Sequence, residues 1–139
     1  MGAGGRVRRL ESFVQGAWHT ADIEGVVTSH AVTGEPVASV SSGGVDFEGT
    51  AAYAREVGGP TLRTMTFHER ASLLKALGQH LFSEKEGLYD LSTATGATRA
   101  DSWIDIEGGA GVLLSYASKG RRELPNSTVL IDGDPEILA

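Results

Sequence analysis

The feature that most constrains the fold of this 139-residue chain is a change in residue periodicity at Ser41-Ser42-Gly43-Gly44. Before this segment, β-branched residues occur in short runs separated by turn residues, a pattern that is typical of strands. After it, apolar residues recur every three or four positions, which indicates helices. The predicted order of elements is therefore two β stretches, four helices and a short final strand.

The first β stretches predict a hairpin. Residues 10–14 are expected to form a short strand, and Gly16 offers a turn after it. A second β stretch covers residues 25–41 and is broken at Thr33-Gly34-Glu35-Pro36. Because β-branched residues flank this break on both sides, the sequence predicts two strands joined by a tight turn.

Two start signals define the first helices. Asp46 is a suitable N-cap for a helix over residues 47–57, and Gly58-Gly59-Pro60 is expected to end it. Thr66-Phe67-His68-Glu69 is a capping box, with the threonine as N-cap and the glutamate three residues later. The helix that it opens has a predicted apolar face made of Leu73, Leu74, Leu77 and Leu81.

The rest of the chain predicts further helices. A second capping box, Ser83-Glu84-Lys85-Glu86, indicates a new helix or a kink that ends at Thr95-Gly96. A last long helix is expected from about residue 101 to 121, and residues 128–131 read as a short strand. A lone hairpin is only marginally stable without a larger sheet. Together with the apolar faces that the helices carry on one side, this indicates partners outside this chain. The predicted class is α/β, with a hairpin, about four helices and a terminal strand.

Composition excludes several classes of protein. A formal net charge of −6 argues against a nucleic-acid partner. The absence of cysteine removes disulfides, thiolate metal sites and a cysteine nucleophile. No stretch is apolar enough to span a membrane or to act as a signal peptide, so the cytoplasm is the expected location. Residues 1–9 are expected to be a flexible leader, and residues 10–139 to form one incomplete domain.

The clearest candidate for chemistry is the run Gly108-Gly109-Ala110-Gly111. A dinucleotide-binding loop needs a preceding strand and a third glycine, but this run follows a helical stretch and Leu114 occupies the third position. Glycine inside a helix costs roughly 1 kcal/mol relative to alanine. Three glycines in four positions therefore suggest that another element packs closely here, or that a ligand needs the space.

No other side chains predict an assembled site. The four histidines, His19, His30, His68 and His80, form no pair with zinc-binding spacing. Asp101 and Asp105 are four residues apart and share a helix face, which favours a solvated acidic surface over a divalent metal site. We therefore predict no catalytic residue and no metal ligand in this chain.

Several segments resemble aldehyde dehydrogenases. Phe13-Val14-Gln15-Gly16-Ala17-Trp18 is similar to the entry strand of that family, and Thr33–Val40 and Phe67–Leu74 resemble the segments that follow it. More specific are Thr95–Gly109 and Arg122-Glu123-Leu124-Pro125, which resemble the bifunctional ring-opening enzymes of bacterial phenylacetate degradation. The resemblance covers about residues 10–138, nearly the whole chain.

The resemblance implies a segment of an NADP- or NAD-dependent enzyme that oxidises a CoA-linked semialdehyde, joined to a hydratase-like domain. In such a dehydrogenase a cysteine thiolate attacks the aldehyde, hydride passes to the nicotinamide, and a glutamate activates water. This chain has no cysteine, so it would be catalytically incomplete and would bind no dinucleotide alone. An alignment around Tyr116-Ala117 implies that Ile104 and Gly108 line the substrate tunnel, where a small residue leaves room for a bulky substrate.

The leading interpretation is thus the N-terminal segment of an aldehyde dehydrogenase fold. Its expected partners are the remainder of the dehydrogenase polypeptide or the subunits of a homo-oligomer. Two alternatives stay open: a stand-alone helical interaction module, which would use its exposed apolar faces, and a non-functional truncated relic. By itself the chain is expected to be marginally stable or self-associating.

Overall fold

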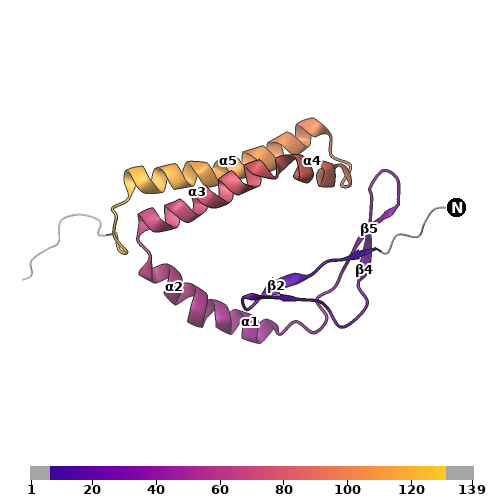
Figure 1. Cartoon of the computed structure of the whole chain (residues 1–139), viewed down its shortest axis with the longest axis horizontal. Coiled ribbons are helices and arrows are strands. Elements are labelled where there is room, and N and C mark those ends of the chain that lie inside the picture. Colours follow the sequence, from indigo (N-terminus) through magenta and orange to yellow (C-terminus); the bar gives the residue numbers. More distant parts are fainter. Residues whose placement is uncertain (1–6, 131–139) are drawn as a thin grey trace, which may run out of the picture.

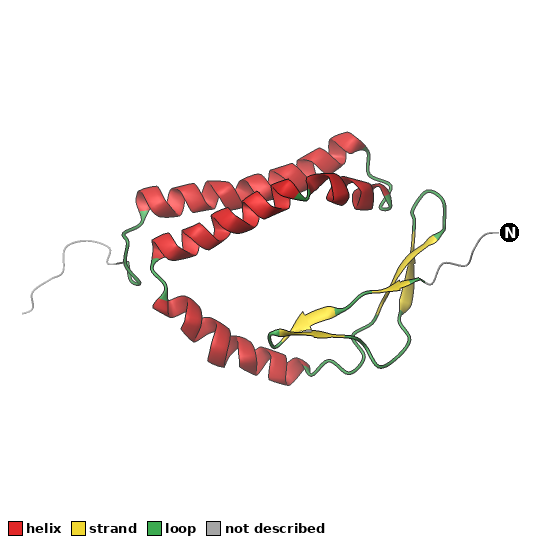
Figure 2. Ribbon diagram, viewed as in Figure 1, coloured by secondary structure: helices red, strands yellow, loops and turns green. Residues whose placement is uncertain are grey.

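The computed structural model describes residues 7–130 as a mixed α/β arrangement, which agrees with the predicted class (Figures 1 and 2). The strands are β1 (Arg8–Arg9), β2 (Ser12–Val14), β3 (Ala17–His19), β4 (Val26–Ser29) and β5 (Pro36–Val40). The helices are α1 (Phe47–Tyr53), the π-helical turn η1 (Ala54–Gly58), α2 (Gly59–Thr64), α3 (Phe67–Ser83), α4 (Lys85–Thr93) and α5 (Arg99–Glu123).

The strands form two small sheets. β2 and β3 make an antiparallel hairpin whose turn residues, Gln15 and Gly16, have φ angles of 51° and 80°. Positive φ at both turn positions matches the right-handed twist of the strands that it joins. The prediction of one strand before Gly16 missed β3, because its short run Ala17–His19 carries no β-branched residue.

The second sheet has the order β1-β5-β4. β4 and β5 pair antiparallel around a turn in which Gly34 has a φ of 74°, so the predicted hairpin is confirmed. Arg8 and Arg9 pair parallel with β5, so ordered pairing begins inside the expected leader of residues 1–9. Met1–Arg6 lie outside the described residues.

The helix that follows Asp46 begins where the sequence predicts but continues further. The Asp46 carboxylate accepts a hydrogen bond from the amide of Gly49 at 2.8 Å, as an N-cap does. Gly58-Gly59-Pro60 does not end the helix, because both glycines adopt right-handed helical angles and α2 runs on to Thr64. Proline lacks an amide proton, and the π turn just before it relaxes the hydrogen-bond ladder at that point. With α1, η1 and α2 counted as one, four helical segments are present in residues 7–130.

Of the three helices that follow α2, α3 and α5 start at well-formed caps. In α3, Thr66 accepts from the amide of Glu69 at 3.2 Å, and Glu69 accepts from the amide of Thr66 at 2.7 Å, so this capping box is confirmed. α5 begins two residues earlier than predicted, because Thr98 and Asp101 form a second reciprocal box. The box predicted at Ser83 does not form, since its hydroxyl donates to the carbonyl of His80, although a new helix does start at Lys85.

The principal contact between elements lies between α3 and α5, which run antiparallel side by side (Figure 1). Small residues line this contact. A Cβ atom added at Gly78 would lie 2.9 Å from the Leu114 side chain and 3.2 Å from the Ala110 carbonyl, and one at Gly120 would lie 3.3 Å from Ala71. The predicted leucine face of α3 is therefore only partly correct, because the close approach uses the small residues beside it. Leu73 and Leu77 are about half exposed.

The core within the described residues is small. The buried apolar residues are Ala21, Ala38, Ala71, Tyr89, Ala110 and Ala117. Most large apolar side chains of residues 7–130 are instead exposed, among them Trp18, Phe47, Trp103 and Ile104. The described part of the chain therefore does not cover them.

The segment after α5 turns back rather than forming a strand. The amide of Phe67 donates to the carbonyl of Ser127 at 2.9 Å, which ties this segment to the start of α3. Residues 128–130 have no strand structure, so the terminal strand predicted over 128–131 is wrong for the part that the structure describes. Ile131 lies outside the described residues.

We expect the substitution Gly78→Leu to lower the free energy of unfolding by about 1–3 kcal/mol, because it forces a side chain between the backbones of α3 and α5. The matched control is Gly87→Leu in α4, where an added Cβ meets nothing within 4 Å. This control should be neutral or slightly stabilising, because leucine favours a helix more than glycine does. Urea unfolding followed by circular dichroism measures both changes, and equal effects at the two positions would contradict the packing described here.

Candidate functional site

The outward face of α5 carries both residues that the family resemblance implies line a substrate tunnel. Ile104 and Gly108 are four residues apart, so they share one helix face. Ala110 and Ala117, which are buried, lie on the opposite side of the helix toward α3. The Ile104 side chain is 62% exposed, and a Cβ atom added at Gly108 would meet nothing within 4 Å. This chain therefore leaves open space over both positions.

The neighbouring glycines are equally uncovered. Cβ atoms added at Gly109 and Gly111 would also meet nothing within 4 Å. Close packing of α5 on α3 therefore does not explain this glycine run, because the contact is made by the alanines instead. Two explanations for the glycine run remain: space for a ligand, and close packing by an element outside residues 7–130.

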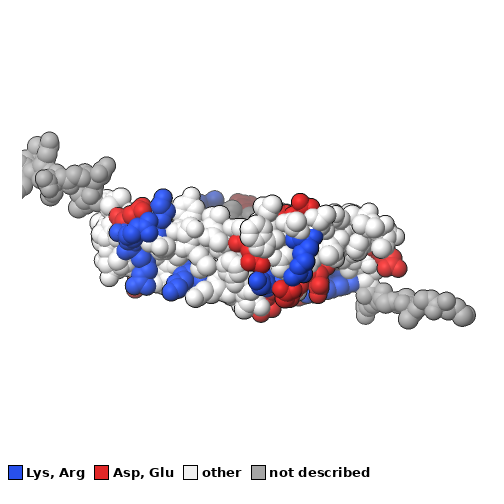
Figure 3. Space-filling view, turned by 90° about the horizontal axis from the view of Figure 1, so that it is seen from above, with Lys and Arg blue, Asp and Glu red and all other residues white. Residues whose placement is uncertain are grey.

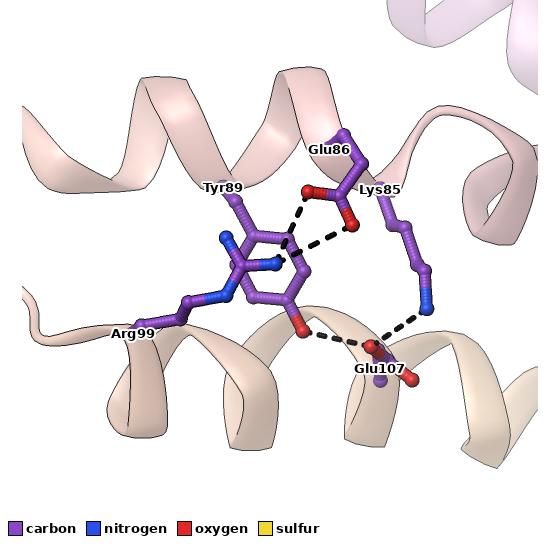
Figure 4. A network of polar contacts seen from close by, with 5 residues as sticks. All are labelled: Lys85, Glu86, Tyr89, Arg99 and Glu107. Carbon is purple, nitrogen blue, oxygen red and sulfur yellow. Dashed lines mark hydrogen bonds and ion pairs between the residues drawn. The ribbon is translucent and has the colours of Figure 1, made fainter.

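A polar network fixes the position of α5 against α4 (Figure 4). The hydroxyl of Tyr89 donates to Oε1 of Glu107 at 2.7 Å, and Nζ of Lys85 lies 3.1 Å from the same oxygen. The Arg99 guanidinium lies 4.2 Å from the centroid of the Tyr89 ring and pairs with Glu86 at 3.1 Å. Because these contacts join side chains on two helices, they fix the rotation of α5 and hence the direction that Gly108 faces.

The contacts of this network shift its pKa values. The hydrogen bond from Tyr89, followed by that from Lys85, holds the pKa of the Glu107 carboxyl below its ordinary value. Burial of the Tyr89 ring raises the pKa of its hydroxyl, and the bond to Glu107 raises it further. Glu107 is therefore an ionised acceptor, a state that holds the two helices together and does not suit a general acid.

The acidic residues of α5 do not gather into a metal site. The hydrogen bond from Thr98 lowers the pKa of Asp101, whose carboxylate is committed to capping the helix. Glu107 is occupied by Tyr89 and Lys85. Within residues 7–130 no group of three His, Cys, Asp or Glu side chains is placed to hold a metal ion.

The histidines serve local structure. Backbone groups lie within hydrogen-bond distance of three of the four rings, those of His19, His30 and His68. Nε2 of His68 lies 2.9 Å from the carbonyl of Leu124 and links the start of α3 to the end of α5. His80 is exposed on α3.

One hollow lies between the three-stranded sheet and the end of α4. It has a volume of about 660 Å³ and is lined mainly by apolar and hydroxyl side chains, among them Leu10, Val37, Leu91 and Thr95. The amide of Ala31 donates to the carbonyl of Ala94 at 2.8 Å and ties the hairpin to this end of α4. The lining contains no acid, thiol or histidine, so the hollow offers apolar contact without catalytic groups.

Sequence reasoning missed the network at Glu107. Lys85 and Tyr89 are four residues apart on a predicted helix and therefore share one face, and this spacing was the available signal. Which acid meets the tyrosine depends on how α4 and α5 align, and that alignment is a tertiary property.

The comparisons with known proteins identify the family of this chain. The aldehyde dehydrogenase family profile matches residues 18–136, and the chain therefore belongs to that family. It is similar to a 3,4-dehydroadipyl-CoA semialdehyde dehydrogenase of Aromatoleum evansii, with 34% identity over 114 residues. The aligned part covers 81% of this chain and 22% of that protein, so the chain spans about a fifth of the relative's length. No helix in the described part of the chain is long and apolar enough to cross a membrane.

We expect Tyr89→Phe to raise the pKa of Glu107 toward its ordinary value, because the strongest stabiliser of the carboxylate is removed. The folded-state pKa is lowered, so this carboxylate contributes stability above its unfolded pKa, and the contribution is lost as pH falls through the folded value. As the pH falls through the acid range, the free energy of unfolding should therefore decrease less steeply in the variant than in the original chain. Carboxyl NMR titration and urea unfolding across that pH range measure both effects. Tyr116→Phe, at an exposed tyrosine outside the network, is the control and should change neither.

Proposed function

We propose that this chain is the N-terminal segment of an NADP- or NAD-dependent aldehyde dehydrogenase that oxidises a CoA-linked semialdehyde in aromatic catabolism, with the phenylacetate type as the nearest resemblance. The family match and the printed activity of the Aromatoleum evansii relative support this proposal. The expected cytoplasmic location suits a chain without cysteine, which needs no oxidising compartment.

The observation that carries the proposal is the uncovered face of α5. Ile104 and Gly108 lie on a helix whose rotation is fixed by the Glu107 network, and none of residues 7–130 fills the space over Gly108. In the proposed enzyme this face forms one wall of the substrate tunnel, and the missing side chain at Gly108 leaves room for a bulky acyl chain. The surface that the chain leaves exposed would be covered by the rest of the enzyme.

The dinucleotide does not fit the residues of this chain. Its glycine run lies in the interior of α5, where backbone amides are bonded within the helix and cannot turn toward a phosphate. A dinucleotide site needs a glycine-rich turn between a strand and a helix N-terminus. The proposed enzyme would therefore supply the cofactor site, the cysteine nucleophile and the glutamate base from other parts of its polypeptide.

The rival function is a stand-alone interaction module. The large exposed apolar side chains favour it, because surfaces of this kind mark contacts with other proteins. The reading frame after codon 139 separates the two, since an in-frame continuation that carries the cysteine segment supports the dehydrogenase.

In the complete enzyme, Gly108→Leu should lower kcat/KM for a CoA-linked semialdehyde by roughly 10- to 200-fold, because the added side chain occupies tunnel space. Gly87→Leu is the matched control, at a helical glycine that is also open but lies on α4. Steady-state production of reduced nicotinamide measures both variants. Unchanged turnover by the Gly108 variant would overturn the tunnel assignment.

The purified 139-residue chain, given a CoA-linked semialdehyde and either NADP⁺ or NAD⁺, should produce no reduced nicotinamide, because it contains no thiol nucleophile. The complete enzyme under the same conditions is the positive control. Activity from the short chain alone would contradict its assignment as a catalytically incomplete segment.

A further inference from the structure

We propose that the 139-residue chain, when no other polypeptide covers α5, forms a symmetric dimer in which the α5 helices of two copies pack antiparallel about Val112. The proposal concerns the chain by itself and does not rest on the dehydrogenase function. It identifies the occupant of the uncovered face as a second copy of the same chain.

The first observation is a stripe on α5 that points away from α3. Asp105, Gly108, Val112, Tyr116 and Lys119 recur at intervals of three and four, so they lie along one side of the helix. All five are exposed, with Val112 at 52% and Tyr116 at 63%. The buried residues Ala110 and Ala117 lie on the other side of the helix.

The second observation is the symmetry of this stripe about Val112. Asp105 precedes Val112 by seven residues and Lys119 follows it by seven, while Gly108 and Tyr116 lie four residues to either side. When two identical helices pack antiparallel about a two-fold axis at Val112, each position meets its mirror position on the other copy. Asp105 then meets Lys119 at both ends of the contact, and Val112 meets Val112 at its centre.

Charge complementarity selects a second copy over an unrelated partner. Neither Asp105 nor Lys119 makes an ion pair within residues 7–130. Figure 3, seen from the side of the molecule on which α5 lies, shows Lys and Arg gathered toward one end and Asp and Glu, mixed with some bases, toward the other. An acidic end and a basic end on one helix attract an antiparallel copy and repel a parallel one.

Shape complementarity reinforces the charge pattern. Tyr116 extends from the helix surface, and the mirror position on the other copy is Gly108, over which nothing lies within 4 Å. The aromatic ring of one copy can therefore occupy the space that the glycine of the other leaves open. Exposed aromatic residues that enter such spaces carry much of the binding energy at protein interfaces.

The same face also offers apolar surface for a second copy to cover. Val112 and Tyr116 on this stripe, and Ile104 beside it, are each more than half exposed. Apolar and aromatic side chains of this kind form the buried centre of protein interfaces.

The test is sedimentation equilibrium on the 139-residue chain over a range of concentrations. We expect a mass that reaches twice the 14.6 kDa monomer mass and rises no further, because a two-fold contact closes on itself. A chain that stays monomeric at every concentration would overturn the dimer and leave the dehydrogenase proposal untouched. A mass that keeps rising would also overturn it, since an open-ended assembly is not two-fold symmetric.

Charge reversal tests the register of the two helices. Asp105→Lys and Lys119→Glu should each weaken dimerisation about tenfold or more, because each creates two like-charge contacts per dimer. An equimolar mixture of the two variants should regain the dimer, and so should one chain that carries both changes. Glu56→Lys, the same charge change on the exposed surface of η1, is the control and should leave the dissociation constant unchanged. Failure of the mixture and of the double variant to regain the dimer would overturn the register.

Discussion

The close approach of α3 and α5 is the contact on which the rest of this structure depends. It is made by residues with little or no side chain, with Ala71 near Gly120 and Gly78 against the Ala110 backbone. Small residues bring two backbones together, but they bury little apolar area and so contribute little hydrophobic stabilisation. This accounts for both the close approach of the two helices that lie side by side in Figure 1 and the small core. The larger apolar side chains, Ile104 and Val112 among them, remain on outward surfaces.

Packing of small residues alone leaves the rotation of a helix weakly determined, and the polar network supplies the missing constraint. Tyr89 is buried between α4 and α5, and its hydroxyl has one acceptor in Glu107. A rotation of α5 would separate this pair and leave a buried hydroxyl without a partner, which is costly. The direction of Gly108 is thereby tied to a contact made by the residue just before it. The direction of the candidate site at Gly108 is thus set by Lys85, Tyr89 and Glu107, which lie outside that site.

Local signals in the sequence predicted local structure well. The Asp46 cap, the Thr66–Glu69 box and the hairpin around Gly34 each depend on residues a few positions apart, and all three are confirmed. Other local signals failed. The box at Ser83 does not form, and the helix continues through Gly58-Gly59-Pro60 although its local signals favour an end. The parallel pairing of β1 with β5 was missed because it joins segments about thirty residues apart. The leucine face of α3 was inferred from periodicity. The contact with α5 is instead made by small residues, which let the two backbones approach closely. Ile104 and Gly108 were placed by resemblance, and no local signal could have shown that the space above them is open.

The open space beside the glycine run of α5 needs a physical explanation. Three glycines in the interior of α5 each cost roughly 1 kcal/mol relative to alanine, and no described residue of the chain contacts the space beside them. A ligand or a polypeptide outside residues 7–130 would account for them. In the proposed dehydrogenase, the space over Gly108 would stay accessible to an acyl chain, whereas in the proposed dimer of the isolated chain the Tyr116 ring of the second copy would fill it. These two occupants exclude each other, so covering α5 with the remainder of the enzyme would both complete the tunnel and remove the surface through which the isolated segment associates.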